Sequence, residues 1–154
     1  MKQHSYTNKK VNYLYNIHDK FTAGIMLEGW EVKALDLFAG DINRSYCNFN
    51  GKDFCLFNSK ITPQHNHVLD NKSITDKEFQ TRRLLLNKSE IKKIRSHISA
   101  KGYTCVPIRL YRNNDHLWKI DIALVTGKNV RDKRQDLKDR DMKRDAQRDM
   151  KKES

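Results

Sequence analysis

Residues 46–57 read YCNFNGKDFCLF, and this stretch decides the class of fold. It places an Asn50-Gly51 pair between two runs that are rich in aromatic and apolar residues. An Asn-Gly pair suits a tight turn because glycine tolerates a positive φ, and aromatic residues favour strands. The stretch therefore predicts a β-hairpin, and the chain is expected to be built from antiparallel strands.

A second hairpin is predicted between residues 104 and 125. The runs TCVPIRLYR (104–112) and LWKIDIALV (117–125) are apolar and β-branched, and Asn113-Asn114-Asp115 supplies the turn between them. Pro107 lacks a backbone N–H, which predicts a bulge or an edge position in its strand. Residues 14–17 and 23–27 are shorter strand candidates. Several short antiparallel strands in one small domain predict a mainly β fold, either a small closed barrel or a sandwich.

Two helices interrupt this strand pattern. The clearer one starts after Asn87, a good N-cap residue, with Glu90 placed to complete a capping box and Gly102 placed to stop the helix. Isoleucines at positions 91, 94 and 98 share its inner face. A shorter helix is predicted over residues 30–38, with Gly29 as its cap. The outer face of the first helix is either a solvated surface or an RNA-facing one, because it carries Lys88, Lys92, Lys93 and Arg95.

The charge of the chain indicates a polyanionic partner. Its 154 residues include 31 Lys and Arg against 19 Asp and Glu, which gives a net charge of +12. Such an excess repels itself unless a polyanion neutralises it, and nucleic acid is the commonest polyanion in the cytosol. A membrane surface is the rival partner, but the sequence shows no strongly amphipathic helix with a bulky apolar face.

The composition divides the chain into three parts. Residues 1–12 form a basic N-terminal arm with three lysines and no acid, and residues 13–126 hold the core-forming side chains. Residues 127–154 carry eleven basic and seven acidic residues, and they contain no aromatic residue and no Ile. This charged tail is expected to be disordered when free and to fold only against a partner.

Several classes of protein are excluded by the sequence. No run of 18 or more apolar residues exists, and the start of the chain lacks the apolar stretch of a secretory signal, so a cytoplasmic protein is expected. Cys47, Cys55 and Cys105 are odd in number and form no CxxC pair, which argues against a disulfide framework and against a structural zinc site. They are expected to be reduced, half-buried strand residues.

The sequence predicts a binding module with no catalytic residue, no metal and no cofactor. His65 and His67 flank Asn66, but the other histidines are scattered without the spacing of metal ligands. The sequence contains neither a GxxxxGK[ST] phosphate loop nor a GxSxG serine. Glu31 is the one acid expected to be semi-buried, where it would accept hydrogen bonds locally or from RNA.

Six fragments follow one another along the chain: Asn8-Lys9-Lys10, FTAGI (21–25), GWEVK (29–33), RLLLNK (83–88), VPIRLY (106–111), and Gly127-Lys128 followed by Asp132-Lys133-Arg134. In this order they resemble the small protein B family, the bacterial tmRNA-binding proteins. The resemblance runs from about Asn8 into the tail and implies an oligonucleotide-binding-like antiparallel β-barrel over residues 13–126, with accessory α-helices.

The resemblance also implies a function in trans-translation. In that family the barrel holds the tRNA-like domain of tmRNA, and the complex enters ribosomes stalled on messages without a usable stop codon. The tail, helical on the ribosome, lies in the decoding site and the empty mRNA channel, and the incomplete nascent peptide receives a degradation tag. The implied partners are tmRNA, the ribosome with its small-subunit RNA and, indirectly through charged tmRNA, elongation factor Tu, but neither DNA nor a membrane.

The residues that match the family's motifs are expected to carry these roles. Lysines would neutralise phosphates, and an outward-facing Leu85 would contact an unstacked loop base, although core packing is the ordinary role of such a leucine. Tyr15 would either stack on a base or pack in the core. The expected RNA-binding residues are Asn8, Lys9, Lys10, Tyr15, Thr22, Glu31, Lys33, Arg83, Leu85, Lys88 and Lys128, and the expected decoding-site residues are Asp132, Lys133 and Arg134.

Three positions depart from the family pattern. Thr22 stands where the family often has Glu, and Asp36 and Phe38 interrupt a usual Leu-Arg-Ala-Gly stretch.

Two other functions remain open. A general ribosome-associated or assembly protein that binds ribosomal RNA without tmRNA is the first alternative. A nuclease or other RNA-processing enzyme is the second, and it lacks a paired-carboxylate or histidine constellation.

Overall fold

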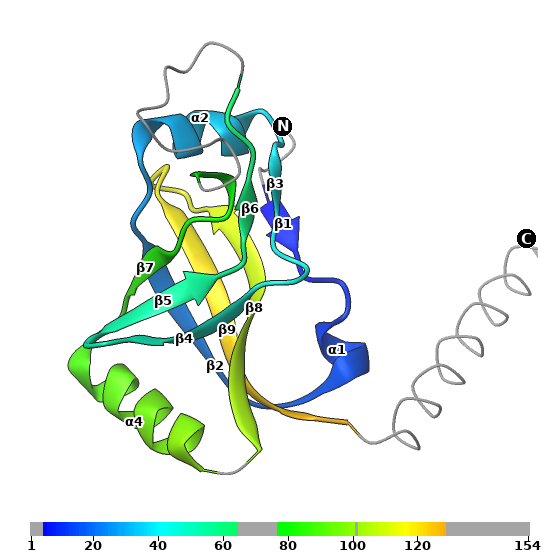
Figure 1. The fold of residues 1–154 in the computed structure, drawn as a ribbon, viewed down its shortest axis with the longest axis vertical. Helices are drawn as coiled ribbons and strands as arrows, with labels where there is room; N and C mark the ends of the chain where they lie inside the picture. The colour runs from blue at the N-terminus through cyan, green and yellow to red at the C-terminus, as the bar shows by residue number, and fades with distance from the viewer. Residues whose placement is uncertain (1–4, 65–76, 101, 129–154) are drawn as a thin grey trace, which may run out of the picture.

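The structure is a computed structural model, and it describes residues 5–64, 77–100 and 102–128. Strands are the main regular structure in this part of the chain, with short helices at the periphery (Figure 1). The helices are α1 (Val11–Leu14), α2 (Gly29–Asp36) and α4 (Lys88–Ser99). The strands are β1 (Ser5–Thr7), β2 (Tyr15–Ile25), β3 (Gly40–Asp41), β4 (Tyr46–Asn50), β5 (Asp53–Phe57), β6 (Lys60–Ile61), β7 (Arg82–Leu85), β8 (Tyr103–Arg112) and β9 (Trp118–Gly127).

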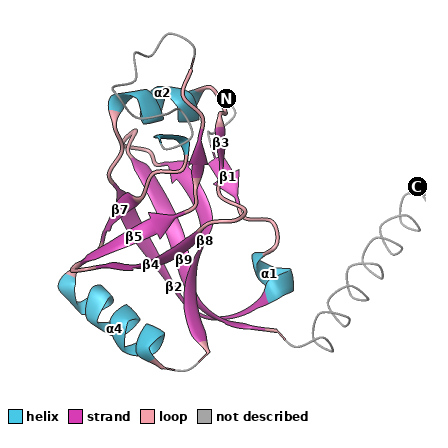
Figure 2. Ribbon diagram, viewed as in Figure 1, coloured by secondary structure: helices cyan, strands magenta, loops and turns pink. Residues whose placement is uncertain are grey.

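The strands form a sheet that closes on itself. Its order is β1-β8-β4-β5-β7-β2-β9, and a further pairing of β8 with β9 joins the two sides of the sheet into a ring (Figure 2). All the pairings between these strands are antiparallel. The short strands β3 and β6 pair separately beside the ring. The mainly β, antiparallel architecture predicted from the sequence is confirmed.

Both predicted hairpins are present. In the first, Asn50 pairs with Asp53, so the two-residue loop is Gly51-Lys52 and Gly51 has a φ of +65°. In the second, Arg112 pairs with Trp118, and the register of β8 against β9 shifts between Pro107 and Arg109. The predicted bulge at the proline is therefore confirmed.

The two short strands predicted over residues 14–17 and 23–27 are the ends of one strand. Residues 15–25 form β2, which pairs with β9 from Tyr15 to Gly24, with a register shift between Ile17 and Asp19. The polar residues 18–20 looked like a break in the sequence pattern. They stay in the strand because β9 continues to pair with β2 on both sides of this shift, so the backbone groups there keep hydrogen-bond partners.

Of the two longer helices, α4 has the predicted N-cap and α2 has a different one. In α4, Asn87 Oδ1 accepts a hydrogen bond from Glu90 N at 2.9 Å, and the Glu90 carboxylate accepts one from Asn87 N at 3.2 Å, so the predicted capping box is confirmed. In α2 the N-cap is Glu28 rather than Gly29. This helix ends at Asp36 instead of residue 38, because Phe38 takes a left-handed φ of +60°.

The structure corrects two further expectations. Cys47, Cys55 and Cys105 are buried rather than half-buried, and Cys47 on β4 and Cys105 on β8 belong to the main core cluster. Burial raises the pKa of the Cys47 thiol well above its ordinary value. From Ser5 onward the predicted arm is also part of the fold, because β1 pairs with β8 and Val11 is buried.

Within residues 5–64, 77–100 and 102–128, no helix is long and apolar enough to cross a membrane. Of the predicted tail, residues 129–154 lie outside the described residues.

Phe38 offers a test of backbone strain. It is 59% exposed at a φ of +60°, whereas its neighbour Leu37 is 63% exposed at an ordinary φ of −97°. The left-handed region is unfavourable for residues with a Cβ, so Phe38→Gly should raise the free energy of unfolding by about 0.5–1 kcal/mol in urea denaturation. Leu37→Gly is the matched control and should lower it, because glycine there only adds disorder to the unfolded chain. A loss of stability in both variants would contradict this account.

Candidate RNA-binding surface

The first group of predicted site residues surrounds a hollow beside α1. The hollow has a volume of about 350 Å³, and its lining includes two cations, Lys10 and Arg44, and two aromatic rings, Tyr15 and Tyr46. Tyr15 also packs against the small core cluster around Val11, so the packing role expected as one alternative is confirmed. Proteins commonly bind nucleic acid with cations that contact the phosphates and with aromatic rings on which the bases stack.

Hydrogen bonds fix the segment that enters this hollow. Asn8 is 7% exposed, and its side-chain Nδ2 donates to Pro107 O at 3.0 Å, so Asn8 anchors the backbone to β8 instead of projecting outward. Lys9 N donates to Asn43 Oδ1 at 3.1 Å. These contacts hold the exposed side chains of Lys9 and Lys10 at the rim of the hollow.

Lys128 joins the end of β9 to this same region. Its Nζ donates to Asn12 O at 2.6 Å, and its backbone N donates to Leu14 O at 3.0 Å. The described chain therefore ends against α1, beside the hollow.

The second group lies around another hollow at the far end of β2. This hollow has a volume of about 310 Å³ and is lined mainly by apolar side chains, among them Ile25, Leu85 and Leu117. Leu85 is 48% exposed and Leu84 is 2% exposed, so the structure confirms that Leu85 is the leucine that faces outward. Gly24 pairs with Leu85, and a Cβ at Gly24 would lie only 3.3 Å from that of Leu85, which explains the glycine.

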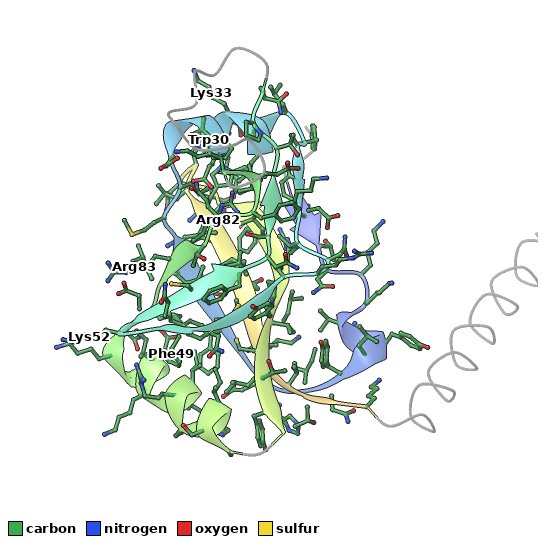
Figure 3. The ribbon with its side chains drawn as sticks, in the orientation of Figure 1. Trp30, Lys33, Phe49, Lys52, Arg82 and Arg83 are labelled. Carbon is green, nitrogen blue, oxygen red and sulfur yellow. The ribbon has the colours of Figure 1, made fainter. Side chains whose placement is uncertain are left out.

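Polar and charged residues flank this apolar hollow. Thr22 Oγ1 donates to Asp121 Oδ1 at 2.9 Å. Arg83 Nε lies 3.4 Å from Asp53 Oδ1 in an exposed ion pair. Lys33 on α2 is exposed (Figure 3), and so is Lys88 at the start of α4.

The structure thus divides the predicted residues into two surfaces. We call them the α1 surface (Lys9, Lys10, Tyr15, Lys128) and the β7 surface (Thr22, Lys33, Arg83, Leu85, Lys88). They lie at opposite ends of β2, whose eleven residues span about 33 Å. No single small ligand contacts both, whereas a folded RNA can.

Glu31 belongs to neither surface, which corrects its predicted role. It is 1% exposed and bonds through its carboxylate to the Nε of Arg82, which is 2% exposed. A side chain enclosed in this way has no surface to offer RNA.

Arg82 is the residue that sequence reasoning missed. Its Nη1 donates to Ser59 O at 2.8 Å and to Gln80 O at 3.1 Å, and its Nη2 donates to Glu78 O at 3.2 Å. Burial lowers its pKa, and the Glu31 carboxylate opposes that shift, so the guanidinium stays charged at neutral pH. A signal for it existed, because the alternation that turns Leu85 outward turns Arg82 inward with Leu84.

Asp132, Lys133 and Arg134, which were expected in the decoding site, lie outside the described residues, as do His65 and His67. In the part of the chain that is described, no group of three or more His, Cys, Asp or Glu side chains could hold a metal ion.

A closed antiparallel ring with two exposed surfaces rich in cations, aromatic rings and aliphatic side chains defines a small β-rich protein of the nucleic-acid-binding class. The family model described as SmpB protein matches residues 5–152, so the chain belongs to the SmpB family. Its relatives include the SsrA-binding proteins of Flavobacterium psychrophilum and Psychrobacter cryohalolentis. Each is 40% identical over 146 residues, which are 92% and 95% of this chain and 91% and 90% of the relatives.

A solved structure also resembles this chain. It is described as "tmRNA-SmpB: a journey to the center of the bacterial ribosome". The TM-score is 0.64 at 29% identity, and the match covers 82% of this chain and 86% of the other.

The buried ion pair leads to a prediction that separates support of the fold from contact with RNA. Glu31→Ala leaves Arg82 charged and unpaired in the interior, which should lower the free energy of unfolding by about 3–5 kcal/mol. The double variant Glu31→Leu with Arg82→Met removes both charges and should recover part of that loss. Urea denaturation measures both. An unchanged midpoint for Glu31→Ala would mean that the carboxylate is free to act elsewhere.

Proposed function

We propose that this chain binds the tRNA-like domain of tmRNA and supports trans-translation, the rescue of stalled ribosomes with tagging of the incomplete peptide. The proposal is supported by membership of the SmpB family and by relatives named SsrA-binding proteins. The observation that carries it is the outward-facing Leu85 beside an apolar hollow, with Arg83 and Lys88 on either side. It acts as a binding protein without a reaction of its own.

The physical roles of the β7 surface follow from its side chains. Arg83, Lys33 and Lys88 neutralise phosphates, an interaction that releases counterions and weakens as salt rises. Leu85 and the adjoining hollow receive an unstacked loop base, because a base removed from its stack gains from contact with apolar surface.

The α1 surface and the tail are proposed to serve the ribosome. Lys128 ties the end of the described chain to Asn12 and Leu14, so the tail departs from the α1 end of the molecule. That end lies away from Leu85 along the length of β2. The arrangement lets one end hold tmRNA while Asp132, Lys133 and Arg134 enter the decoding site and the tail follows the empty mRNA channel.

The proposal is tested first by filter binding. The full-length protein should bind the tRNA-like domain of tmRNA much more tightly than random RNA of the same length, with an affinity that falls as salt rises. Equal affinity for the two RNAs would overturn the proposal and favour a general protein of ribosome assembly. Cleavage of either RNA in the presence of magnesium would favour an RNA-processing enzyme.

Leu85 and Leu84 provide a matched pair of variants. Leu85→Ala should weaken binding of the tRNA-like domain and leave stability nearly unchanged, because the side chain faces outward. Leu84→Ala should lower the free energy of unfolding by about 2–5 kcal/mol, because it opens a cavity in the core. Filter binding and urea denaturation of both variants check this, and equal stability losses would mean that Leu85 is an ordinary core residue.

The tail is tested separately from RNA binding. Replacing Asp132, Lys133 and Arg134 together by Ala should leave affinity for the tRNA-like domain nearly intact and abolish peptide tagging on stalled ribosomes. Removal of residues 129–154 should give the same pair of results while keeping the contacts of Lys128. A large loss of affinity in the triple variant would instead assign these residues to the tmRNA surface.

A further inference from the structure

One face of α4 carries a row of cations, none of which forms an ion pair within the described residues. Lys88, Lys92 and Arg95 are exposed and follow one another at helical spacings of four and three residues, which places them on one face. We call this row the α4 stripe. It is about 10 Å long, since a helix rises about 1.5 Å per residue.

Contacts on the two sides of α4 fix the direction of the stripe. The Arg95 guanidinium lies 4.0 Å from the centre of the Phe49 ring, so the stripe faces the β4–β5 hairpin. Lys93 lies on the other side, where its Nζ is 2.5 Å from Asp19 Oδ2 on β2. Lys93 is therefore neutralised within the molecule.

Lys88 and Lys92 have no acidic partner in the described residues. The nearby acids are engaged elsewhere, because Asp53 pairs with Arg83 and the Glu90 carboxylate caps the helix. Two like charges four residues apart repel each other, and a cation at Lys88 also opposes the positive end of the helix dipole. This arrangement is unfavourable in the free protein and becomes favourable when a polyanion lies along the stripe.

The stripe continues the β7 surface without a break in the chain. Lys88 follows Leu85 by three residues, and Arg83 lies on the outer side of β7 (Figure 3). Lys52 projects from the tip of the β4–β5 hairpin, the hairpin that Arg95 contacts (Figure 3). An RNA whose loop base rests on Leu85 can thus extend its backbone toward these cations.

We propose that the α4 stripe binds the phosphate backbone of the same tRNA-like domain that Leu85 contacts. The inference rests on the proposed function and adds a site to it. A row of this length reaches about two or three successive phosphates of one strand. Its contribution is independent of base sequence, because lysine and arginine contact the phosphates that every nucleotide carries.

Lys92 and Lys93 are adjacent on one helix and allow a matched test. Lys92→Gln should reduce affinity for the tRNA-like domain about 3- to 10-fold at low salt and lower the slope of log affinity against log salt by about one. Lys93→Gln removes a charge already neutralised by Asp19 and should change the affinity less than 2-fold. Lys60→Gln on β6, which breaks the ion pair of Lys60 with Glu78, is the distant control. Lys92→Arg should retain binding.

Thermal unfolding separates loss of contact from loss of structure. Lys92→Gln should leave the Tm unchanged or slightly raised, because it relieves repulsion with Lys88. Equal effects of Lys92→Gln and Lys93→Gln on affinity, or an unchanged salt slope for Lys92→Gln, would overturn the proposal. The proposal would also be overturned if Lys92→Gln lost affinity for small ribosomal subunits and kept its affinity for the tRNA-like domain. If the wild-type protein fails to prefer the tRNA-like domain over random RNA, the proposed function itself fails.

Discussion

The buried pair of Arg82 and Glu31 is the interaction on which the rest of the β7 surface depends. Its guanidinium ties α2, through Glu31, to the backbone of Ser59 and to the turn at residues 77–80. Because side chains alternate along a strand, holding Arg82 inside also holds Leu84 inside and turns Arg83 and Leu85 outward. The orientation of the exposed leucine is thus set by a charged residue that never reaches the surface.

The closure of the ring gives the molecule its two ends. β2 pairs with β9 along most of its length, and β9 pairs with β8, so Tyr15 and Gly24 lie on one stiff, doubly supported element. The α1 surface sits at one end of this element and the β7 surface at the other. A fixed separation of this kind suits a protein that holds one RNA and reaches toward a second.

Local patterns were predictable from the sequence, and long-range pairs were not. The hairpin at residues 46–57, the Pro107 bulge and the Asn87 cap depend on neighbours within a few positions, so the sequence displays their causes directly. Glu31 and Arg82 are 51 residues apart, and only the fold brings them together. The sequence alone therefore left Glu31 to accept hydrogen bonds either locally or from RNA, and the structure shows the local alternative.

The departures from the family pattern have physical causes in this chain. Thr22 lies directly opposite Asp121, and its hydroxyl donates to that carboxylate. A glutamate at position 22 would set two carboxylates against each other across the strands, which is destabilising, so Asp121 favours a hydroxyl there. Asp36 pairs with Arg112, and Phe38 accepts the left-handed φ that a glycine would take freely.

The ion pairs that the acids form within the fold also explain why some cations remain available at the surface. Among the described residues, Asp19, Glu31, Asp36, Asp53 and Glu78 are each paired with a cation of the fold. Acids spent inside or beside the ring cannot neutralise the cations that remain. Lys9 and Lys10 beside α1 and Lys88 and Lys92 on α4 are exposed and take part in none of these five ion pairs. The proposed contacts with RNA use these lysines, because the five acids named above are already engaged in holding the fold together.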